Sequence, residues 1–411
     1  MKTILLGGSV AALILAGCST SENSVESSAW YNSAIVNAKE QMALQVQAIE
    51  ADTTARVLNP VTTKRNRFST AYCGYADWRS GFFPGSMWYL HELTGDTALV
   101  PLAQKYTEAI AEAQHLTSHH DIGFIINCSY GNGRRFVNKE KYDSVLVTAA
   151  NSLCTRFRPG AGVIQSWNTS PGSWQATKGW TCPVIIDNMM NLELLFEATK
   201  LTGDSTYYNV AVSHADTTLK EHFRQDGSCY HVIDYNPETG EVLHRMTGQG
   251  YADESAWSRG QAWAIYGYTM CYRETGDQRY LDQAVKTFDF MRNHKNMPED
   301  KIPYWDMNAP DVPNEPRDAS TASIIASALY EMSTYPLENA ASYRDYADEI
   351  MKSLASDEYT AKPGENGRFI LKHSTGSIPH NSEIDVPLNY ADYYYLEALK
   401  RKRDLSKSNS I

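Results

Sequence analysis

The sequence predicts an all-α domain in which helical hairpins repeat around a closed ring, an (α/α) toroid. A turn signature recurs at residues 91–96 (HELTGD), 199–204 (TKLTGD) and 273–277 (RETGD). Each copy follows one stretch with helical apolar periodicity and precedes another. Strand-like alternation is sparse, with one candidate from Gly227 to Tyr235. Repeats of this kind indicate stacked helical hairpins.

The chemistry of the turn supports this reading. Glycine suits the left-handed conformation that ends a helix, and the aspartate after it can cap the next helix. Further helices are expected over residues 145–153, 207–219, 280–291 and 343–354, and loops over the proline-rich residues 296–316 and 376–387.

The amino terminus has the features of a bacterial export signal. A short basic start precedes an apolar run from Leu5 to Leu15, which is too short to span a bilayer. The following Leu15-Ala16-Gly17-Cys18 resembles a lipobox, in which cleavage frees Cys18 for lipidation; an ordinary signal peptide would still export the chain. We expect an exported lipoprotein on the periplasmic side of the membrane or at the cell surface. The expected segments are a signal peptide over 1–18, a flexible tether over 19–29, one catalytic domain over 30–400 and a polar tail over 401–411.

Charge and cysteine content exclude some classes of function. The net charge of -11 argues against a nucleic-acid partner, because a phosphate backbone calls for a basic surface. An acidic protein can still bind an acidic sugar through a few basic side chains in one pocket. Six cysteines remain after Cys18, and none forms a CxxC pair, so zinc is not suggested and buried free thiols are expected.

Asp187 is the strongest candidate for acid–base chemistry. It lies in an apolar run, with Ile185 and Ile186 before it and Met189 and Met190 after it. A carboxylate there is costly unless it is paired or protonated, and desolvation raises its pKa toward the value that suits a general acid. The alternative is a carboxylate that bonds to backbone or caps a helix.

Asp121 follows two histidines, His119 and His120. A metal site is one alternative, but adjacent side chains on a helix point in different directions and no second ligand cluster is evident, so no metal is expected. A helix N-cap before Ile122 is another alternative. A carboxylate that faces Asp187 across a cavity would hold the two pKa values apart, so that one group stays protonated while the other is ionised.

Arg259 and Trp263 are four residues apart and share a face if their segment is helical. A guanidinium beside an indole can bind a carboxylate and stack against a ring; the alternative is an arginine packed over a core tryptophan. Weaker single signals, from polar or aromatic side chains that suit a sugar site, come from His231, Gln249, Trp78 and Trp167.

Together these segments resemble the unsaturated glucuronyl hydrolases of glycoside hydrolase family 88. The similarity extends from about Asp77 to Leu399. Its ordered motifs are DW-x-x-GF at Asp77, HHDIGF at His119, IQ-x-W at Ile164, IID at Ile185, WSRGQAWAIYG between Gln249 and Gly267, YWD at Tyr304, RDASTASI at Arg317 and DYYYLEAL at Asp392. The resemblance implies an (α/α)6 barrel, which agrees with the hairpin pattern.

The resemblance also implies roles for individual residues. Asp187 matches the catalytic acid/base, and Asp121 matches the second aspartate, which orients the sugar and tunes its partner. Residues that match the family's pocket, and would stack the ring or bond its polar groups, are Trp78, His120, Trp167, His231, Gln249, Arg259 and Trp263. In the segment 373–379, some members that prefer sulfated sugars use hydroxyl and lysine side chains; this chain offers Ser374 and Ser377, with Lys372 just before.

The implied reaction is hydration of a double bond. Polysaccharide lyases leave a C4=C5 vinyl ether on the non-reducing uronic acid. Asp187 would donate a proton to C4, and water, deprotonated by the same group, would add at C5. The hemiketal then opens and the glycosidic bond is lost, with no metal or organic cofactor. The expected partners are unsaturated uronyl oligosaccharides, and a membrane through Cys18.

Three other functions are alternatives. An unsaturated rhamnogalacturonyl hydrolase has a related fold and the same chemistry, but the HHDIGF and WSRGQAW segments favour the glucuronyl family. A non-catalytic glycan-binding lipoprotein would lack a catalytic carboxylate, whereas Asp121 and Asp187 are both present. A polysaccharide lyase would need a Tyr/His or similar site for proton abstraction.

Overall fold

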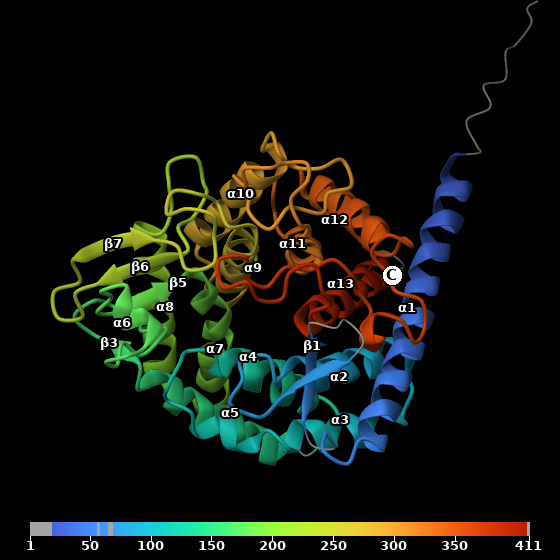
Figure 1. Cartoon of the computed structure of the whole chain (residues 1–411), viewed down its shortest axis with the longest axis horizontal. Coiled ribbons are helices and arrows are strands. Elements are labelled where there is room, and N and C mark those ends of the chain that lie inside the picture. Colours follow the sequence, from blue (N-terminus) through green and yellow to red (C-terminus); the bar gives the residue numbers. More distant parts are fainter. Residues whose placement is uncertain (1–18, 56–57, 65–68, 138, 409–411) are drawn as a thin grey trace, which may run out of the picture.

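Two layers of helices form a closed ring in the residues that the structure, a computed structural model, describes: 19–55, 58–64, 69–137 and 139–408 (Figure 1). The inner helices are α2 (Phe82–Thr94), α4 (Ile122–Ile126), α7 (Leu192–Thr202), α9 (Ser258–Thr275), α11 (Ala319–Met332) and α13 (Asn389–Ser408). The outer helices are α1 (Ser19–Ala51), α3 (Leu99–Glu108), α5 (Lys139–Cys154), α8 (Ser205–Glu221), α10 (Gln278–Asn293) and α12 (Ala340–Leu354).

The inner helices contact one another in sequence order. A π-helical turn η2 (Asn127–Gly131) joins α2 to the α4 region, then α4 contacts α7, α7 contacts α9, α9 contacts α11 and α11 contacts α13. The ring closes because α13 packs against α2. The predicted all-α (α/α)6 barrel is therefore confirmed.

Burial patterns explain which helices lie inside. Every residue of α11 except Glu331 is buried, as expected for a helix surrounded by others. In the outer helix α10 the buried side chains, including Tyr280, Ala284, Phe288 and Met291, recur at spacings of three and four. That spacing gives one apolar stripe, which faces the inner layer.

The predicted Thr-Gly-Asp turns are confirmed. The helices α2, α7 and α9 each end at the threonine, and the next residues, Gly95, Gly203 and Gly276, have φ values of 69°, 74° and 71°. Only glycine adopts this left-handed region at no steric cost. Asp204 and Asp277 then cap α8 and α10 by accepting a backbone N–H two residues further on.

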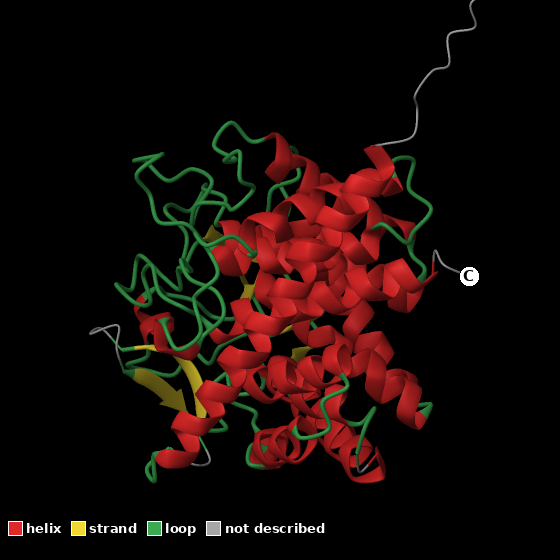
Figure 2. Cartoon of the chain, turned by 90° about the vertical axis from the view of Figure 1, so that its right-hand side faces the viewer, coloured by secondary structure: helices red, strands yellow, loops and turns green. Residues whose placement is uncertain are grey.

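Many of the loops gather at one end of the helices (Figure 2). The antiparallel pairs are β1 (Asn59–Thr63) with β2 (Thr70–Cys73), β3 (Phe157–Arg158) with β4 (Val163–Ile164), and the three-stranded sheet β5 (Pro183–Ile185), β6 (Val232–Tyr235) and β7 (Val242–Met246). The strand expected at 227–235 is confirmed over its second half. The segments 296–316 and 376–387 are loops, as expected.

The two ends of the described chain differ from expectation. Helix α1 begins at Ser19, so the segment 19–29 is helical and not a flexible tether. Helix α13 continues to Ser408, so residues 401–408 are not a separate polar tail. Both segments extend helices whose neighbouring turns pack on the barrel, and Arg401 is held by ion pairs to Glu331 and Glu397. Extending an existing helix avoids the cost of nucleating a new one.

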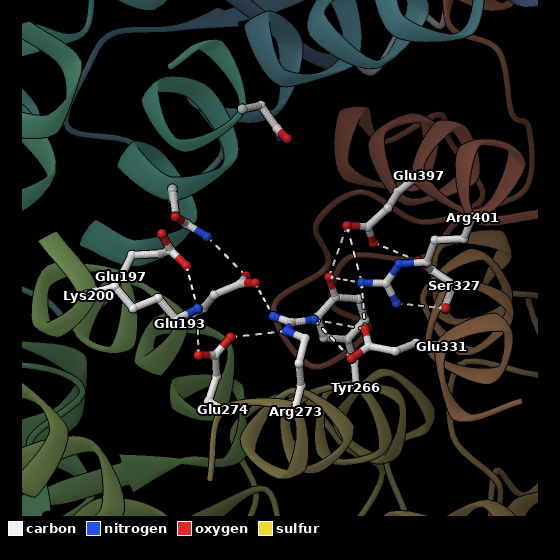
Figure 3. Close-up of polar contacts among 12 residues, drawn as sticks. Glu193, Glu197, Lys200, Tyr266, Arg273, Glu274, Ser327, Glu331, Glu397 and Arg401 are labelled. Carbon is white, nitrogen blue, oxygen red and sulfur yellow. Dashed lines mark hydrogen bonds and ion pairs between the residues drawn. The ribbon is translucent and has the colours of Figure 1, made fainter. Parts of the chain in front are cut away.

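A charged network joins α7, α9, α11 and α13 near the carboxyl ends of α9 and α11 (Figure 3). Arg273 pairs with Glu193 and, at 2.9 Å, with Glu331. Arg401 lies 2.9 Å from Glu331 and 3.6 Å from Glu397. Because an unpaired buried charge is costly, these ion pairs favour one relative position of the four inner helices.

Two further features concern the cysteines and the membrane. All six cysteines after Cys18 are free thiols, and all except the half-buried Cys154 are buried, as expected. Within the described part of the chain, no helix is long and apolar enough to cross a membrane. Cys18 and the rest of the expected signal peptide lie outside the described residues.

Candidate active site

A cavity of about 350 Å³ opens where the inner helices begin. Trp78 precedes α2, Asp121 precedes α4, and Arg259 and Tyr390 lie in the first turns of α9 and α13. A helix amino terminus carries partial positive charge, so the convergence of these helix amino termini favours an anionic ligand. The cavity is lined by Trp78, Asp121, Trp167, Trp174, Gln175, Ile185, Asp187, Gly248, Gln249, Arg259, Gly376, Ser377, His380, Ser382, Glu383 and Tyr390.

Asp187 is placed by the three-stranded sheet. Strand β5 leads directly into the 3-10 helix η3 (Ile186–Asn191), in which Asp187 is the second residue. In the sheet Ile185 pairs with Val232, so His231, just before β6, lies beside Asp187. The backbone N–H of Ile186 also donates to the carbonyl of His231, at 3.0 Å.

The surroundings of Asp187 suit a proton donor. Burial is the largest influence and raises its pKa to about 6, although the charges of His120 and Arg259 oppose the change. The hydrogen bond to its own backbone, which the sequence left as an alternative, has a smaller effect on the pKa. Among the described residues, Oδ2 has no hydrogen-bond partner. Asp187 thus titrates in a range where it can both give and take a proton.

Asp121 is held ionised by two histidines. Its Oδ1 lies 3.2 Å from Nε2 of His120, and its Oδ2 lies 3.3 Å from Nδ1 of His119. Burial alone would raise the pKa of Asp121, but His120 and His119 outweigh it and hold this pKa well below its usual range. Asp121 occupies the N-cap position of α4, yet its side chain makes no capping hydrogen bond.

His231 faces Asp187 in one tautomer. Its Nδ1 accepts the backbone N–H groups of Gly248, at 2.9 Å, and Gln249, at 3.1 Å. Nδ1 is therefore unprotonated, and Nε2 carries the hydrogen. Nε2 lies 3.8 Å from Oδ2 of Asp187. Burial, followed by the charge of Arg259, holds the pKa of His231 well below its usual value.

The residues expected to bind substrate fall into two groups. Those that line the cavity are Trp78, Trp167, Gln249, Arg259 and Ser377. Those that do not line it and are buried beneath its wall are His120, His231, Trp263 and Ser374.

Trp263 does not form the stacking platform next to Arg259 that the sequence led us to expect. Its indole is fully buried and packs against Phe124 and Tyr394, with ring centroids 5.1 and 5.4 Å away. One turn into an inner helix, a side chain already faces the packed barrel and not the cavity. Ser374 is likewise buried, in a backbone bridge with Val386.

Arg259 holds the cavity wall together. Nη1 donates to Asp318, at 2.9 Å, and to the carbonyl of Thr375, at 2.6 Å. Nη2 donates to Gln249, at 3.0 Å, and to the carbonyl of Gly376, at 2.6 Å. The guanidinium thus ties the loop after residue 373 to α9. The guanidinium also lies 4.6 Å from the ring of Trp257. Arg259 therefore packs over a tryptophan, which was the alternative expected from the sequence, but the tryptophan is Trp257 and not Trp263.

The comparisons with known proteins identify the family. Residues 49–402 match Glycosyl Hydrolase Family 88. The chain belongs to glycoside hydrolase family 88. A relative from Formosa agariphila, an unsaturated glucuronyl hydrolase, is 48% identical over 330 residues, which is 80% of each chain.

Solved structures agree with this assignment. The crystal structure of an unsaturated glucuronyl hydrolase specific for heparin has a TM-score of 0.86 and 44% identity, covering 92% of this chain and 98% of that one. A variant of the Streptococcus agalactiae unsaturated glucuronyl hydrolase, complexed with dGlcA-GalNAc6S, has a TM-score of 0.75 and 29% identity, covering 90% and 91%. The family resemblance seen in the motifs, and the expectation of a glycosidase, are confirmed.

The sequence reading missed several residues that line the cavity of this family 88 enzyme: Trp174, Gln175, His380, Ser382, Glu383 and Tyr390. The ring of Trp174 lies 5.2 Å from that of Trp180 and 5.0 Å from that of His380. Ser377 and His380 are joined by a 2.6 Å hydrogen bond. Tryptophans among Ser, Gly and Thr residues at 168–181 are a usable signal for an aromatic loop.

Glu383 is held in an unusual conformation at the cavity edge. Its φ is 56°, in the left-handed region that a side chain with a Cβ rarely adopts. An ion pair to Arg79, which also pairs with Asp77, holds its side chain. Strain of this kind persists where the surrounding structure determines it, and it is concentrated at functional sites.

Two questions left by the sequence concern metal binding and Lys372. In the part of the chain described, no three His, Cys, Asp or Glu side chains converge as a metal site would need. Lys372 does not line the cavity; its ammonium donates to the carbonyl of Asp357, at 2.7 Å.

Proposed function

We propose that this family 88 enzyme removes the Δ4,5-unsaturated uronic acid from the non-reducing end of lyase-generated, glycosaminoglycan-type oligosaccharides. The observation that carries the proposal is the pair of carboxylates in one cavity. Burial raises the pKa of Asp187 to about 6, whereas two histidines hold that of Asp121 well below its usual range. Such a pair supplies a proton donor beside an ionised acceptor.

The chemistry follows from these states. Asp187 donates its proton to C4 of the vinyl ether, and positive charge develops at C5 and the ring oxygen. The ionised Asp187 then takes a proton from water as the water oxygen bonds to C5, which restores the starting carboxyl group. The resulting hemiketal opens and the glycosidic bond is lost. Acid–base help of this type contributes roughly 10²–10⁴-fold to the rate.

Recognition of the sugar uses the cavity wall. Asp121 accepts hydrogen bonds from the ring hydroxyls, and Trp78 and Trp167 provide aromatic surfaces for the ring. The charge of Arg259, together with the amino-terminal ends of the inner helices, favours the uronate carboxylate. The heparin specificity of one similar structure and the dGlcA-GalNAc6S complex of another support glycosaminoglycan fragments as the substrate class.

The direct test is absorbance at the band of the C4=C5 chromophore. The purified protein is mixed with lyase-generated disaccharides from heparin, chondroitin and hyaluronan. Falling absorbance is expected, and the fastest substrate identifies the parent glycan. Rising absorbance on intact polymer would mean a lyase, and no change on any disaccharide would contradict the proposal.

We propose as well that the chain is an exported lipoprotein anchored at Cys18. The support is the basic start, the apolar run and the Leu-Ala-Gly-Cys sequence. Expression in a bacterial host with radiolabelled palmitate should label the wild-type protein in the membrane fraction. The Cys18→Ala variant should carry no label, and equal labelling of both would contradict the anchor.

A further inference from the structure

Ser166 lies between the two candidate catalytic aspartates but does not line the cavity. It is fully buried and follows β4. Its backbone N–H donates to the carbonyl of Pro183, at 2.9 Å, and its carbonyl accepts the N–H of His120, at 3.1 Å. The backbone of Ser166 thus contacts both the strand that leads to Asp187 and the segment that carries Asp121.

The Ser166 hydroxyl makes two hydrogen bonds. Its Oγ accepts the backbone N–H of Ile185, at 2.9 Å, and lies 3.3 Å from Nδ1 of His120. An N–H only donates, so the hydroxyl hydrogen remains available for Nδ1 of His120. Among the described residues, the Ser166 hydroxyl hydrogen has no other hydrogen-bond acceptor.

This arrangement selects one tautomer of His120. If Ser166 donates to Nδ1, the ring hydrogen is on Nε2, and Nε2 lies 3.2 Å from Oδ1 of Asp121. A ring protonated on Nδ1 would instead leave the Ser166 hydroxyl hydrogen without an acceptor in a fully buried place. Such an unsatisfied donor is costly, so of the two tautomers of the uncharged ring the one with hydrogen on Nε2 is favoured.

We propose that Ser166 is a positioning residue that acts through His120 to hold Asp121 as a fixed, ionised acceptor. The Ile185 N–H donates to Ser166, the Ser166 hydroxyl donates to His120, and Nε2 of His120 lies 3.2 Å from Oδ1 of Asp121. Because Ile185 is two residues before Asp187, the same hydroxyl links the backbone beside the proton donor to the second aspartate. This inference rests on the roles proposed above for the two aspartates.

The parallel with His231 strengthens the argument. There too, Nδ1 is occupied by donors, from the backbone of Gly248 and Gln249, and Nε2 is directed at a carboxylate. Each aspartate therefore lies near Nε2 of a buried histidine, and a donor to Nδ1 on the other side of the ring selects the tautomer. For His231 the donors are backbone N–H groups. For His120 the donor is the Ser166 side chain, which a substitution can remove.

A double-mutant cycle tests the proposal through activity. Ser166→Ala should lower kcat on the best unsaturated disaccharide by about tenfold, as expected for loss of a buried hydrogen bond. In a His120→Ala background the same substitution should change kcat by less than about twofold, because Ser166 then has nothing to position. An equal fold loss in both backgrounds would overturn the proposal, since Ser166 would then act only through Ile185.

The control for this cycle is Ser86→Ala. Ser86 is also buried and does not line the cavity, and its hydroxyl donates to the carbonyl of Phe82 in α2. This variant should keep the wild-type kcat. If Ser166→Ala does not fold, His120→Gln and His120→Leu replace it: glutamine can accept from Ser166 and donate to Asp121, so it should retain at least about tenfold more activity than leucine. Equal activities would overturn the proposal.

The tautomer itself is measurable without substrate. In protein with ¹⁵N-labelled histidine, long-range ¹H–¹⁵N spectra recorded at a pH where the ring is uncharged should show His120, assigned by its loss in His120→Gln, with hydrogen on Nε2. A His120 protonated on Nδ1 would overturn the proposal. This readout does not depend on turnover, so it stands even if Asp121 or Asp187 proves dispensable for activity, in which case the proposed function fails separately.

Discussion

Oδ2 of Asp187 lies 3.8 Å from Nε2 of His231. Because Nδ1 of His231 already accepts two backbone N–H groups, the atom directed at Asp187 is a neutral donor and not a competing base. Burial holds the pKa of His231 well below its usual value and raises that of Asp187 to about 6. Within this pair, Asp187 alone changes its charge near neutral pH.

Replacement of Asp187 tests its role directly. Asp187→Asn keeps the size of the side chain but cannot give or take a proton. We expect kcat to fall by about 10²–10⁴-fold, the usual contribution of a general acid. The measurement is loss of C4=C5 absorbance with time, with folding checked by circular dichroism. Asp204→Asn, at the exposed cap of α8, is the matched control and should keep full activity. Full activity of Asp187→Asn would refute the assignment.

The pH dependence has a definite sign. Asp187 must carry a proton to start the reaction, and its pKa is raised to about 6 by burial. The protonated fraction falls as pH rises through that value, so kcat/KM should be high below about pH 6 and decline above it. Asp121 stays ionised because its pKa is held well below the usual range. A kcat/KM that rises with pH through about 6, at constant ionic strength, would contradict this order of protonation.

The guanidinium of Arg259 should not be replaceable by an ammonium. Lysine can still pair with Asp318, but it cannot hold the carbonyls of Thr375 and Gly376 at the same time. We expect Arg259→Lys to lose roughly 1–3 kcal/mol of stability and at least about tenfold in kcat/KM. Denaturant unfolding and initial rates measure the two effects. Arg279→Lys, at an exposed pair, should change neither.

The charged network away from the cavity should affect stability and not chemistry. Arg401→Met leaves Glu331 and Glu397 without one of their cations. We expect a loss of roughly 3 kcal/mol in the free energy of unfolding, with kcat of the folded enzyme unchanged. Arg344→Met, at an exposed ion pair 3.8 Å long, is the control and should have little effect. A fall in kcat with unchanged stability would contradict this division.

Lys372 should not determine preference for sulfated sugars. Its ammonium is bound to the carbonyl of Asp357 and does not line the cavity. Lys372→Ala should leave the ratio of kcat/KM between sulfated and unsulfated disaccharides unchanged. A selective loss on the sulfated substrate would show that Lys372 leaves this position when substrate binds.

Local features of the fold were predictable because their causes lie within a few residues. A glycine with φ near 70° and the aspartate after it end one helix and start the next, whatever the rest of the chain does. Asp187 was recognisable for a similar reason, since an acid within an apolar run must be paired or protonated. The full extent of α1 and α13 was not predictable in this way, because their polar ends lack the apolar periodicity that marks a helix in a sequence.

The cavity was predictable only in part. The motifs pointed to both aspartates, to Trp78, Trp167, Gln249, Arg259 and Ser377, all of which line it. Trp263 and Ser374 were expected there as well, but a motif does not say which side of a helix or loop faces a cavity. Trp174 and His380 come from segments with no motif, and they meet only because two loops fold over the same opening.

The sequence by itself determined the helical hairpins, their turns, the family and the two acids, because each is encoded by short-range periodicity or by the order of residue types. The tertiary structure alone decided what surrounds those acids. Closure of the ring brings Arg259 against Thr375, 116 residues later, and places His120 beside Ser166, 46 residues later. Burial and hydrogen bonding set the pKa values and tautomers at these contacts, and neither can be read until distant segments have packed together.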